Sequence, residues 1–263
     1  MKKKYFGILI AVIALTFIFS GCLQQAPLNN GGEEETTTVV LGDITKAKYD
    51  FLTTGATNLS FTGIILADIG KGIILHDATS GIYVYDSSFL DTYGVNVGDY
   101  VTLNATFVYY YNDIEANTFK VVKKGPINET LTPVKLNIEL DPEWLIKSTS
   151  NGDLLNSSSD PASLALWLYR YVTVEGTITL SDDGYTAIEY DTDTGTSCVE
   201  FRSFNNALDY NDLKSKLGNP VTAVGYLGAG YDKWQLCIWD SNNIEYWMKW
   251  INKINFTGPF MAL

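Results

Sequence analysis

The chain has 263 residues, of which 46% are hydrophobic, 13% aromatic and 18% charged. This length allows one large domain or two ordinary ones, and the composition excludes a disordered chain. The formal net charge of −12 disfavours a protein that holds polyanions through bulk electrostatics. The single histidine, His76, excludes a histidine-cluster metal site, so we expect neither a metal nor another cofactor.

Residues 1–21 have the features of a signal peptide. Three lysines follow the first methionine, and residues 6–19 form an uncharged run that is too short to span a hydrocarbon core as a helix. The run leads into Gly21 and Cys22, which resembles the lipobox of prokaryotic lipoproteins, with Phe19 where leucine is usual. The resemblance implies cleavage before Cys22, acylation of Cys22, and anchoring in the cell membrane at its extracytoplasmic face.

After the signal peptide the sequence predicts five further segments. Residues 22–42 are polar, include three consecutive glutamates and lack apolar periodicity, so they are predicted to be a flexible tether. Two OB-type domains are expected at 43–125 and 159–250. A linker joins them at 126–158, where alternation between Val134 and Leu140 predicts one extra strand, and a tail follows at 251–263.

The rest of the chain repeats itself weakly. Alternating residues lead to Gly63 in one copy and Gly176 in the other, and the turns that end at Gly81 and Gly195 lie 114 residues apart. Each copy reads as five short strands of period two. Five strands of this kind are expected to close into a barrel, because closure removes exposed sheet edges.

A short helix is predicted before each copy. The first covers residues 43–52, and the second covers residues 162–169 behind an N-cap candidate at Asp160 and a proline at Pro161. We therefore predict a mainly β protein with two tandem five-stranded OB-type barrels, each preceded by a short helix, after a lipoprotein signal peptide.

Residues 73–85 and 97–115 are similar to OB-type domains that recur in secreted bacterial nucleases and surface lipoproteins. In those domains a strand that ends in aspartate turns through glycine into a strand of aliphatic and aromatic residues. The resemblance covers residues 43–125 and, more faintly, 160–250, with Asn104 where these domains have glycine. It implies the OB-type fold; no nuclease catalytic domain is attached, so it implies no catalytic activity.

Aromatic side chains are the candidate ligand-binding residues. Strand alternation places Tyr83 and Tyr85 on the outer face where OB barrels bind, with His76 on the same side. Tyr109 and Tyr111 belong to the last hairpin of the first barrel and flank that face. Such rings stack on bases or cover the apolar faces of sugars, although tyrosine also simply suits a half-buried strand.

Catalysis is not expected. His76 lies beside Asp77 without the sequence context of a nucleophile or a metal site, so no catalytic residue is assigned. Cys198 and Cys237 fall on the third and fifth strands of the second barrel, which are neighbours in an OB sheet. They either form a disulfide or remain buried free thiols.

The charge of each domain helps to decide among the candidate partners. Residues 43–125 carry six basic and nine acidic groups, and residues 160–251 carry six and thirteen. We expect a membrane-anchored, non-catalytic binding or scaffolding module whose partner is an oligosaccharide or a protein. The alternative is a nucleic-acid receptor or an accessory module of a nuclease system, with nucleic acid held by the first domain through Lys120, Lys123 and Lys124.

Overall fold

The computed structural model describes residues 43–127 and 129–247. These residues belong to one compact unit of the chain. The expected signal peptide, the acylated Cys22, the tether and the tail at 251–263 lie outside the described residues, so they stay predictions. Within the described ranges, no helix has the length and apolar character needed to cross a membrane.

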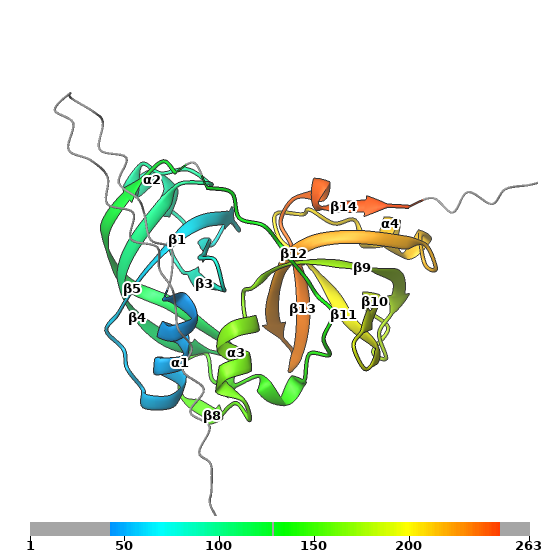
Figure 1. The fold of residues 1–263 in the computed structure, drawn as a ribbon, viewed down its shortest axis with the longest axis horizontal. Helices are drawn as coiled ribbons and strands as arrows, with labels where there is room; N and C mark the ends of the chain where they lie inside the picture. Colours follow the sequence, from blue (N-terminus) through cyan, green and yellow to red (C-terminus); the bar gives the residue numbers. More distant parts are fainter. Residues whose placement is uncertain (1–42, 128, 248–263) are drawn as a thin grey trace, which may run out of the picture. The chain divides into compact units, whose positions relative to one another are not determined.

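The first barrel is closed by five strands in the order β1-β2-β3-β5-β4 (Figure 1). The strands are β1 (Leu59–Asp68), β2 (Ile73–His76), β3 (Gly81–Val84), β4 (Tyr100–Tyr110) and β5 (Asp113–Gly125). Neighbouring strands are antiparallel except for β3 and β5, which run parallel, and pairing of β1 with β4 closes the barrel. Helix α1 (Ile44–Thr54) precedes β1, and α2 (Phe89–Tyr93) joins β3 to β4.

The second barrel repeats this order as β9-β10-β11-β13-β12, with β12 pairing back onto β9. The strands are β9 (Tyr171–Leu180), β10 (Thr186–Thr192), β11 (Gly195–Ser203), β12 (Pro220–Gly230) and β13 (Lys233–Ile238). Helix α3 (Pro161–Trp167) precedes β9, and α4 (Tyr210–Ser215) joins β11 to β12. A 3₁₀ turn (Ser241–Asn243) and β14 (Ile244–Tyr246), which pairs with β12, follow the barrel.

The structure confirms the predicted fold class of two OB-type barrels, each behind a short helix. Asp160 caps α3 by accepting hydrogen bonds from the backbone N–H groups of Ala162 and Ser163, both at 3.1 Å. Helices α2 and α4 were not predicted, because five or six residues are too few to show a helical periodicity.

The glycines that revealed the repeat have a packing role. A Cβ on Gly176 would lie 2.1 Å from the carbonyl oxygen of Glu189, and one on Gly63 would lie 2.8 Å from the side chain of Leu75. The first strand of each barrel therefore approaches the second strand too closely for any side chain. This close crossing is what allows each five-stranded sheet to bend and close.

The linker is ordered but contains little regular structure. It holds β6 (Val134–Lys135), a 3₁₀ turn (Pro142–Trp144), β7 (Lys147–Ser148) and β8 (Leu154–Asn156). The extra strand expected at 134–140 is thus confined to its first two residues, which pair in parallel with β9. Beyond it the linker is held by side chains: the Tyr190 hydroxyl donates to the Ile138 carbonyl at 3.0 Å, and the Trp234 indole donates to the Asp141 carbonyl at 2.9 Å.

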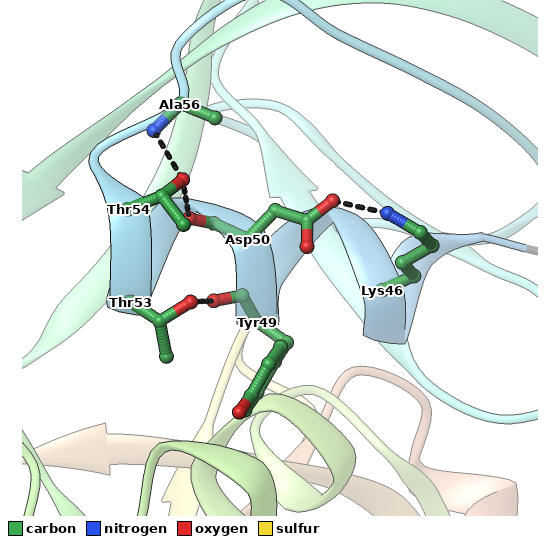
Figure 2. Close-up of polar contacts among 6 residues, drawn as sticks. All are labelled: Lys46, Tyr49, Asp50, Thr53, Thr54 and Ala56. Atoms are coloured by element: carbon green, nitrogen blue, oxygen red, sulfur yellow. Dashed lines mark hydrogen bonds and ion pairs between the residues drawn. The ribbon is translucent and has the colours of Figure 1, made fainter.

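Helix α1 has a polar side and a buried side. On the polar side, Lys46 pairs with Asp50, and the hydroxyls of Thr53 and Thr54 donate to backbone carbonyls one turn earlier (Figure 2). The buried side consists of Ile44, Ala47, Lys48 and Phe51. Burial of a lysine on this side needs an explanation, because the charged form of a lysine loses its hydration there.

Candidate functional site

The outer face of β2 and β3, where the sequence placed the ligand, is covered by the second barrel. His76 is 4% exposed and Tyr83 is 8% exposed. The backbone N–H of Tyr171 donates to His76 Nε2 at 2.9 Å, and the ring of Tyr169 lies 6.4 Å from that of Tyr83. The predicted outward placement is compatible with these contacts, but the predicted access to ligand is wrong, because intramolecular packing uses this face.

His76 is held as a neutral imidazole. Its Nε2 accepts from Tyr171, so the proton resides on Nδ1, which donates to the carbonyl oxygen of Asp77. Burial lowers the pKa of His76 to about 4, outweighing the opposing effect of Asp77. Both ring nitrogens are occupied, so His76 is a structural residue of the interface.

A buried polar cluster lies next to His76. Lys48 Nζ donates to Ser80 Oγ at 2.7 Å and to the Leu168 carbonyl, and burial lowers the pKa of Lys48 well below its usual value. The Asp77 carboxylate accepts from the backbone N–H groups of Ile44 at 2.9 Å and Ser80 at 2.9 Å. These contacts join α1, the β2–β3 turn and the end of α3, so the cluster fixes one barrel against the other.

Two carboxyl groups on β5 also lie in this interface. Burial raises the pKa of Asp113 to about 6 and that of Glu115 to about 7. Arg202 of β11 opposes the shift at Asp113, and its guanidinium donates to the Ala229 carbonyl at 3.3 Å. Among the described residues, Asp113 Oδ1 has no hydrogen-bond partner, which is consistent with a carboxyl that is partly protonated near neutral pH.

The three remaining predicted tyrosines differ in exposure. Tyr109 packs on Phe51 of α1 with ring centroids 4.5 Å apart and is half-buried. Tyr85 is 54% exposed just after β3, where its ring meets the edge of Tyr83. Tyr111 is 55% exposed at the tip of the β4–β5 hairpin. The structure therefore does not gather the five predicted residues into one site.

The tip of the β4–β5 hairpin has an unusual backbone. Its two turn residues are Tyr111 and Asn112, and Tyr111 has a φ of 53°. The equivalent β12–β13 turn consists of Tyr231 and Asp232, with φ of 54° and 61°. Left-handed backbone of this kind is normally given to glycine or asparagine, and a bulky residue there is an outlier.

The two turns are joined to each other. Asn112 Nδ2 donates to Asp232 Oδ1 at 2.9 Å and to the carbonyl oxygen of Ile146 at 3.0 Å. Lys147 pairs with the other carboxylate oxygen of Asp232 at 2.8 Å. The backbone N–H of Ser148 donates to the Tyr111 carbonyl at 2.7 Å. The linker thus holds the last hairpins of both barrels side by side.

These contacts bring exposed apolar side chains into one region. Tyr110 is 41% exposed and makes an edge contact with Tyr111 at 4.8 Å, and Tyr231 is 91% exposed. Leu155 of β8, 69% exposed, belongs to the short hairpin that begins next to Ser148. We call Tyr110, Tyr111, Tyr231 and Leu155 the tip surface.

Asp232 is the charge next to the tip surface that is paired, whereas Asp153 of the β7–β8 hairpin is exposed and has no ion-pair partner among the described residues. Hydrogen bonds from Lys147 and Asn112 lower the pKa of Asp232, so this carboxylate is ionised and is neutralised by Lys147. Other acidic residues of the second barrel lie elsewhere, such as Glu189 and Asp191 on the exposed side of β10. The four side chains of the tip surface are three tyrosines and a leucine, so the surface itself consists of rings, hydroxyls and an aliphatic group.

Tyr231 is the functional candidate that the sequence interpretation missed. The signal was present, because the repeat aligns the pair Tyr111-Asn112 with the pair Tyr231-Asp232. Only the structure shows that both tyrosines have positive φ and that the two turns touch. The contact between the two turns depends on how the barrels pack against each other, and the spacing of the sequence repeat carries no information on that packing.

The basic residues expected to hold nucleic acid lie on β5. Lys120 and Lys123 are exposed, and Lys124 donates to the carbonyl oxygen of Tyr93. Along β5 these lysines lie far from the tip of the β4–β5 hairpin, so they are not part of the tip surface.

The two cysteines of the second barrel are free thiols. They lie on the adjacent strands β11 and β13, as expected, but Arg202 is the residue that pairs with Cys237. Cys198 lies four residues further along β11, about 13 Å away at the usual rise per residue, which is too far for a disulfide. Cys198 is exposed and Cys237 is buried, so the alternative of two buried thiols is also only half correct.

Metal binding has no support in residues 43–127 and 129–247. No group of three or more His, Cys, Asp or Glu side chains in these ranges is placed to hold a metal ion. No site residue of that kind was expected from the sequence.

Comparisons with known proteins do not identify a family for this chain. No protein-family model matches the chain, and no curated protein matches it. Matching solved structures include a murine DNA-binding protein bound with double-stranded DNA, at 13% identity and TM-score 0.28, covering 73% of this chain and 98% of that one. The HIN2 domain of tetrameric p202 matches at 14% identity and TM-score 0.29, covering 73% and 95%.

A deletion mutant of the single-stranded DNA-binding protein from Thermus aquaticus matches at 9% identity and TM-score 0.25, covering 75% of this chain and 86% of that one. Likenesses with such low identities and TM-scores do not support any transfer of function.

Proposed function

We propose that this chain is a lipid-anchored, extracytoplasmic binding module without catalytic activity, and that its tip surface binds a neutral oligosaccharide. The observation that carries the proposal is the pair of exposed tyrosines, Tyr111 and Tyr231, in left-handed backbone at equivalent turns of the two barrels. The two turns are fixed to each other through Asn112 and Asp232.

The strained backbone supports a binding role. A non-glycine residue in this region costs on the order of 1–3 kcal/mol, and such strain is concentrated at functional sites. Tyr231 is 91% exposed, so its ring contributes almost nothing to the core in return. A hairpin selected for stability alone would have asparagine or glycine at these two positions.

The chemistry of the tip surface favours a neutral sugar polymer. Exposed tyrosine rings offer flat apolar faces for the C–H faces of sugar rings, and their hydroxyls exchange hydrogen bonds with sugar hydroxyls. The nearest ionised pair, Lys147 and Asp232, is already neutralised internally. The excess of acidic residues over the whole chain disfavours a polyanion.

The absence of catalysis is part of the proposal. The one histidine is buried with both ring nitrogens engaged, so it is not available as a general base. The carboxyls Asp113 and Glu115 lie on β5 between the barrels, where Asp113 pairs with Tyr110 at the base of the hairpin and Glu115 lies two residues further along the strand.

A glycan array followed by affinity electrophoresis of the full chain in detergent tests the binding proposal. We expect retardation by a neutral polysaccharide that the double variant Tyr111→Ser/Tyr231→Ser loses. Tyr185→Ser is the matched control, because Tyr185 is 62% exposed in the turn between β9 and β10. Binding of no glycan, or equal loss in the control, would contradict the proposal.

A single-stranded DNA titration of the same samples distinguishes oligosaccharide binding from the alternative, a nucleic-acid receptor. If DNA binds, weakens steeply with salt and depends on Lys120 and Lys123, the chain is a nucleic-acid receptor and the tip-surface proposal fails. Those two lysines are exposed and unpaired among the described residues, so Lys120→Gln/Lys123→Gln is a clean test.

The membrane anchor has its own test. Cys22→Ser removes the proposed acylation site, and we expect it to move the chain from the membrane fraction to the soluble fraction, because two acyl chains make a stable anchor. Cys198→Ser is the control, since this cysteine belongs to the second barrel. Retention of Cys22→Ser in the membrane would show that another segment holds the chain there.

A further inference from the structure

A cavity beside the interface between the barrels contains two unpaired charges of opposite sign. Its volume is about 240 Å³, and it lies between the β2–β3 turn, the first part of the linker and Arg170. Arg170 and Glu129 both line it. Among the residues that the structure describes, neither forms an ion pair with the other or with any further group.

The side chain of Arg170 is held in place, but one of its N–H groups has no hydrogen-bond acceptor. It lies directly before β9, and its guanidinium packs over the ring of Trp167 at 4.5 Å. Its Nε is buried and has no hydrogen-bond partner in the described part of the chain. Burial lowers the pKa of Arg170, but a guanidinium remains charged at any physiological pH, so a buried N–H is left without an acceptor.

The other polar groups of the cavity wall do not meet this need. His76 uses both ring nitrogens within the interface. The Asp77 carboxylate is already engaged by Ile44, Thr79 and Ser80. Among the described residues, none of these side chains accepts a hydrogen bond from Arg170 Nε, so its guanidinium is available to an anionic group in the cavity.

The remaining wall sets the size and character of that molecule. Thr130 and Thr132 contribute hydroxyls, and Ile64 and Val134 contribute apolar surface. Glu129 is exposed, so it lies at the mouth of the cavity and repels a second negative charge. A ligand that satisfies both ends carries a carboxylate for Arg170 and a cationic group for Glu129.

We propose that this cavity binds a small zwitterionic carboxylate, of the size and charge pattern of an α-amino acid or a betaine. The carboxylate accepts from the Arg170 guanidinium, the ammonium group faces Glu129, and the apolar part lies against Ile64 and Val134. The site is independent of the tip surface and does not require the oligosaccharide proposal to be correct.

Nitrogen-15 NMR of the arginine side chains tests the proposal on the full chain in detergent. The chain has only two arginines, Arg170 and Arg202, so Arg170→Gln assigns the Nε–H signals. The probes are valine, glycine betaine, propionate, valinamide and inorganic phosphate at millimolar concentrations. We expect valine and betaine to shift the Arg170 signal, propionate to shift it more weakly, and valinamide to leave it unchanged.

Two further variants keep the test decisive if Arg170→Gln disturbs packing on Trp167. Glu129→Gln changes an exposed residue and should weaken valine binding by about tenfold while leaving propionate binding unchanged or stronger. Glu139→Gln, at another exposed linker position, should change neither. An Arg170 signal that responds to none of the carboxylates, or a response to phosphate alone, would overturn the proposal.

Discussion

The side-chain amide of Asn112 donates to the carboxylate of Asp232 at 2.9 Å, and these two residues occupy the same position in the last hairpins of the two barrels. One copy has the donor and the other has the acceptor, so the repeat has diverged into a complementary pair. The result is one surface built from both copies. A single barrel of this type would have only half of it.

The Asn112–Asp232 contact is expected to couple the two turns measurably. A double-mutant cycle with Asn112→Ala and Asp232→Ala should give an interaction free energy of about 0.5–1 kcal/mol, because the bond is exposed but charge-assisted. Denaturant unfolding measures it. Lys147→Met provides the comparison, since it removes the other partner of Asp232 and leaves the Asn112 bond in place. Strict additivity would show that the turns are not energetically joined.

At Tyr231, a substitution that relieves backbone strain is expected to stabilise the fold and to weaken ligand binding. Tyr231→Asn should raise the free energy of unfolding by roughly 0.5–1 kcal/mol, because asparagine suits the first position of a turn with two positive φ values. The same variant should lose oligosaccharide binding. Tyr185→Asn, at an exposed position outside the positive-φ set, should bring no such gain. Destabilisation by Tyr231→Asn would mean that the ring makes a structural contact.

Much of the fold could be predicted from the sequence because strand alternation and turn glycines are local signals. The close crossing at Gly176 and the cap at Asp160 are of this kind. The interpretation of His76 and Tyr83 failed for a different reason: their exposure depends on where Tyr169 and Tyr171 of the second barrel lie. No local pattern encodes a contact between residues about a hundred positions apart.

The interface carboxyls should make stability fall as the pH rises from about 4 to about 7. Burial raises the pKa of Asp113 to about 6 and that of Glu115 to about 7, so over this range the folded chain keeps protons that the unfolded chain has released. His76 acts in the opposite direction between about pH 4 and 6.5, because burial lowers its pKa to about 4 and the unfolded chain binds the proton first. Among these three groups, two carboxyls against one imidazole give a net fall; the lowered pKa of the buried Lys48 acts in the same direction as that of His76.

Denaturant unfolding at several pH values separates these contributions. Asp113→Asn should flatten the decline, because it removes one group that keeps its proton in the folded state. His76→Gln should steepen the decline below pH 6.5, because it removes a group that counteracts it. Slopes that change in the same direction in both variants would show that the interface does not bury these groups as described.

Packing of the second barrel on the first is expected to depend on the absence of a side chain at Gly81. A Cβ there would lie 2.5 Å from the carbonyl oxygen of Tyr169 and 3.1 Å from the ring of His76. Gly81→Ala should therefore separate the two surfaces locally and lower the free energy of unfolding by about 1–3 kcal/mol. Gly125→Ala is the control, because its nearest neighbour is the movable ring of Tyr100 at 3.3 Å, and it should cost less.

The state of His76 reports this separation directly, since the chain has one histidine and its imidazole nitrogens give an unambiguous NMR signal. In the unaltered chain the ring should remain neutral, with its proton on Nδ1, until the pH approaches about 4. In Gly81→Ala the Tyr171 N–H no longer reaches Nε2 and water enters, so the pKa of His76 should rise toward 6.5. A lower stability without any change in the His76 titration would place the damage inside the first barrel instead of at the interface.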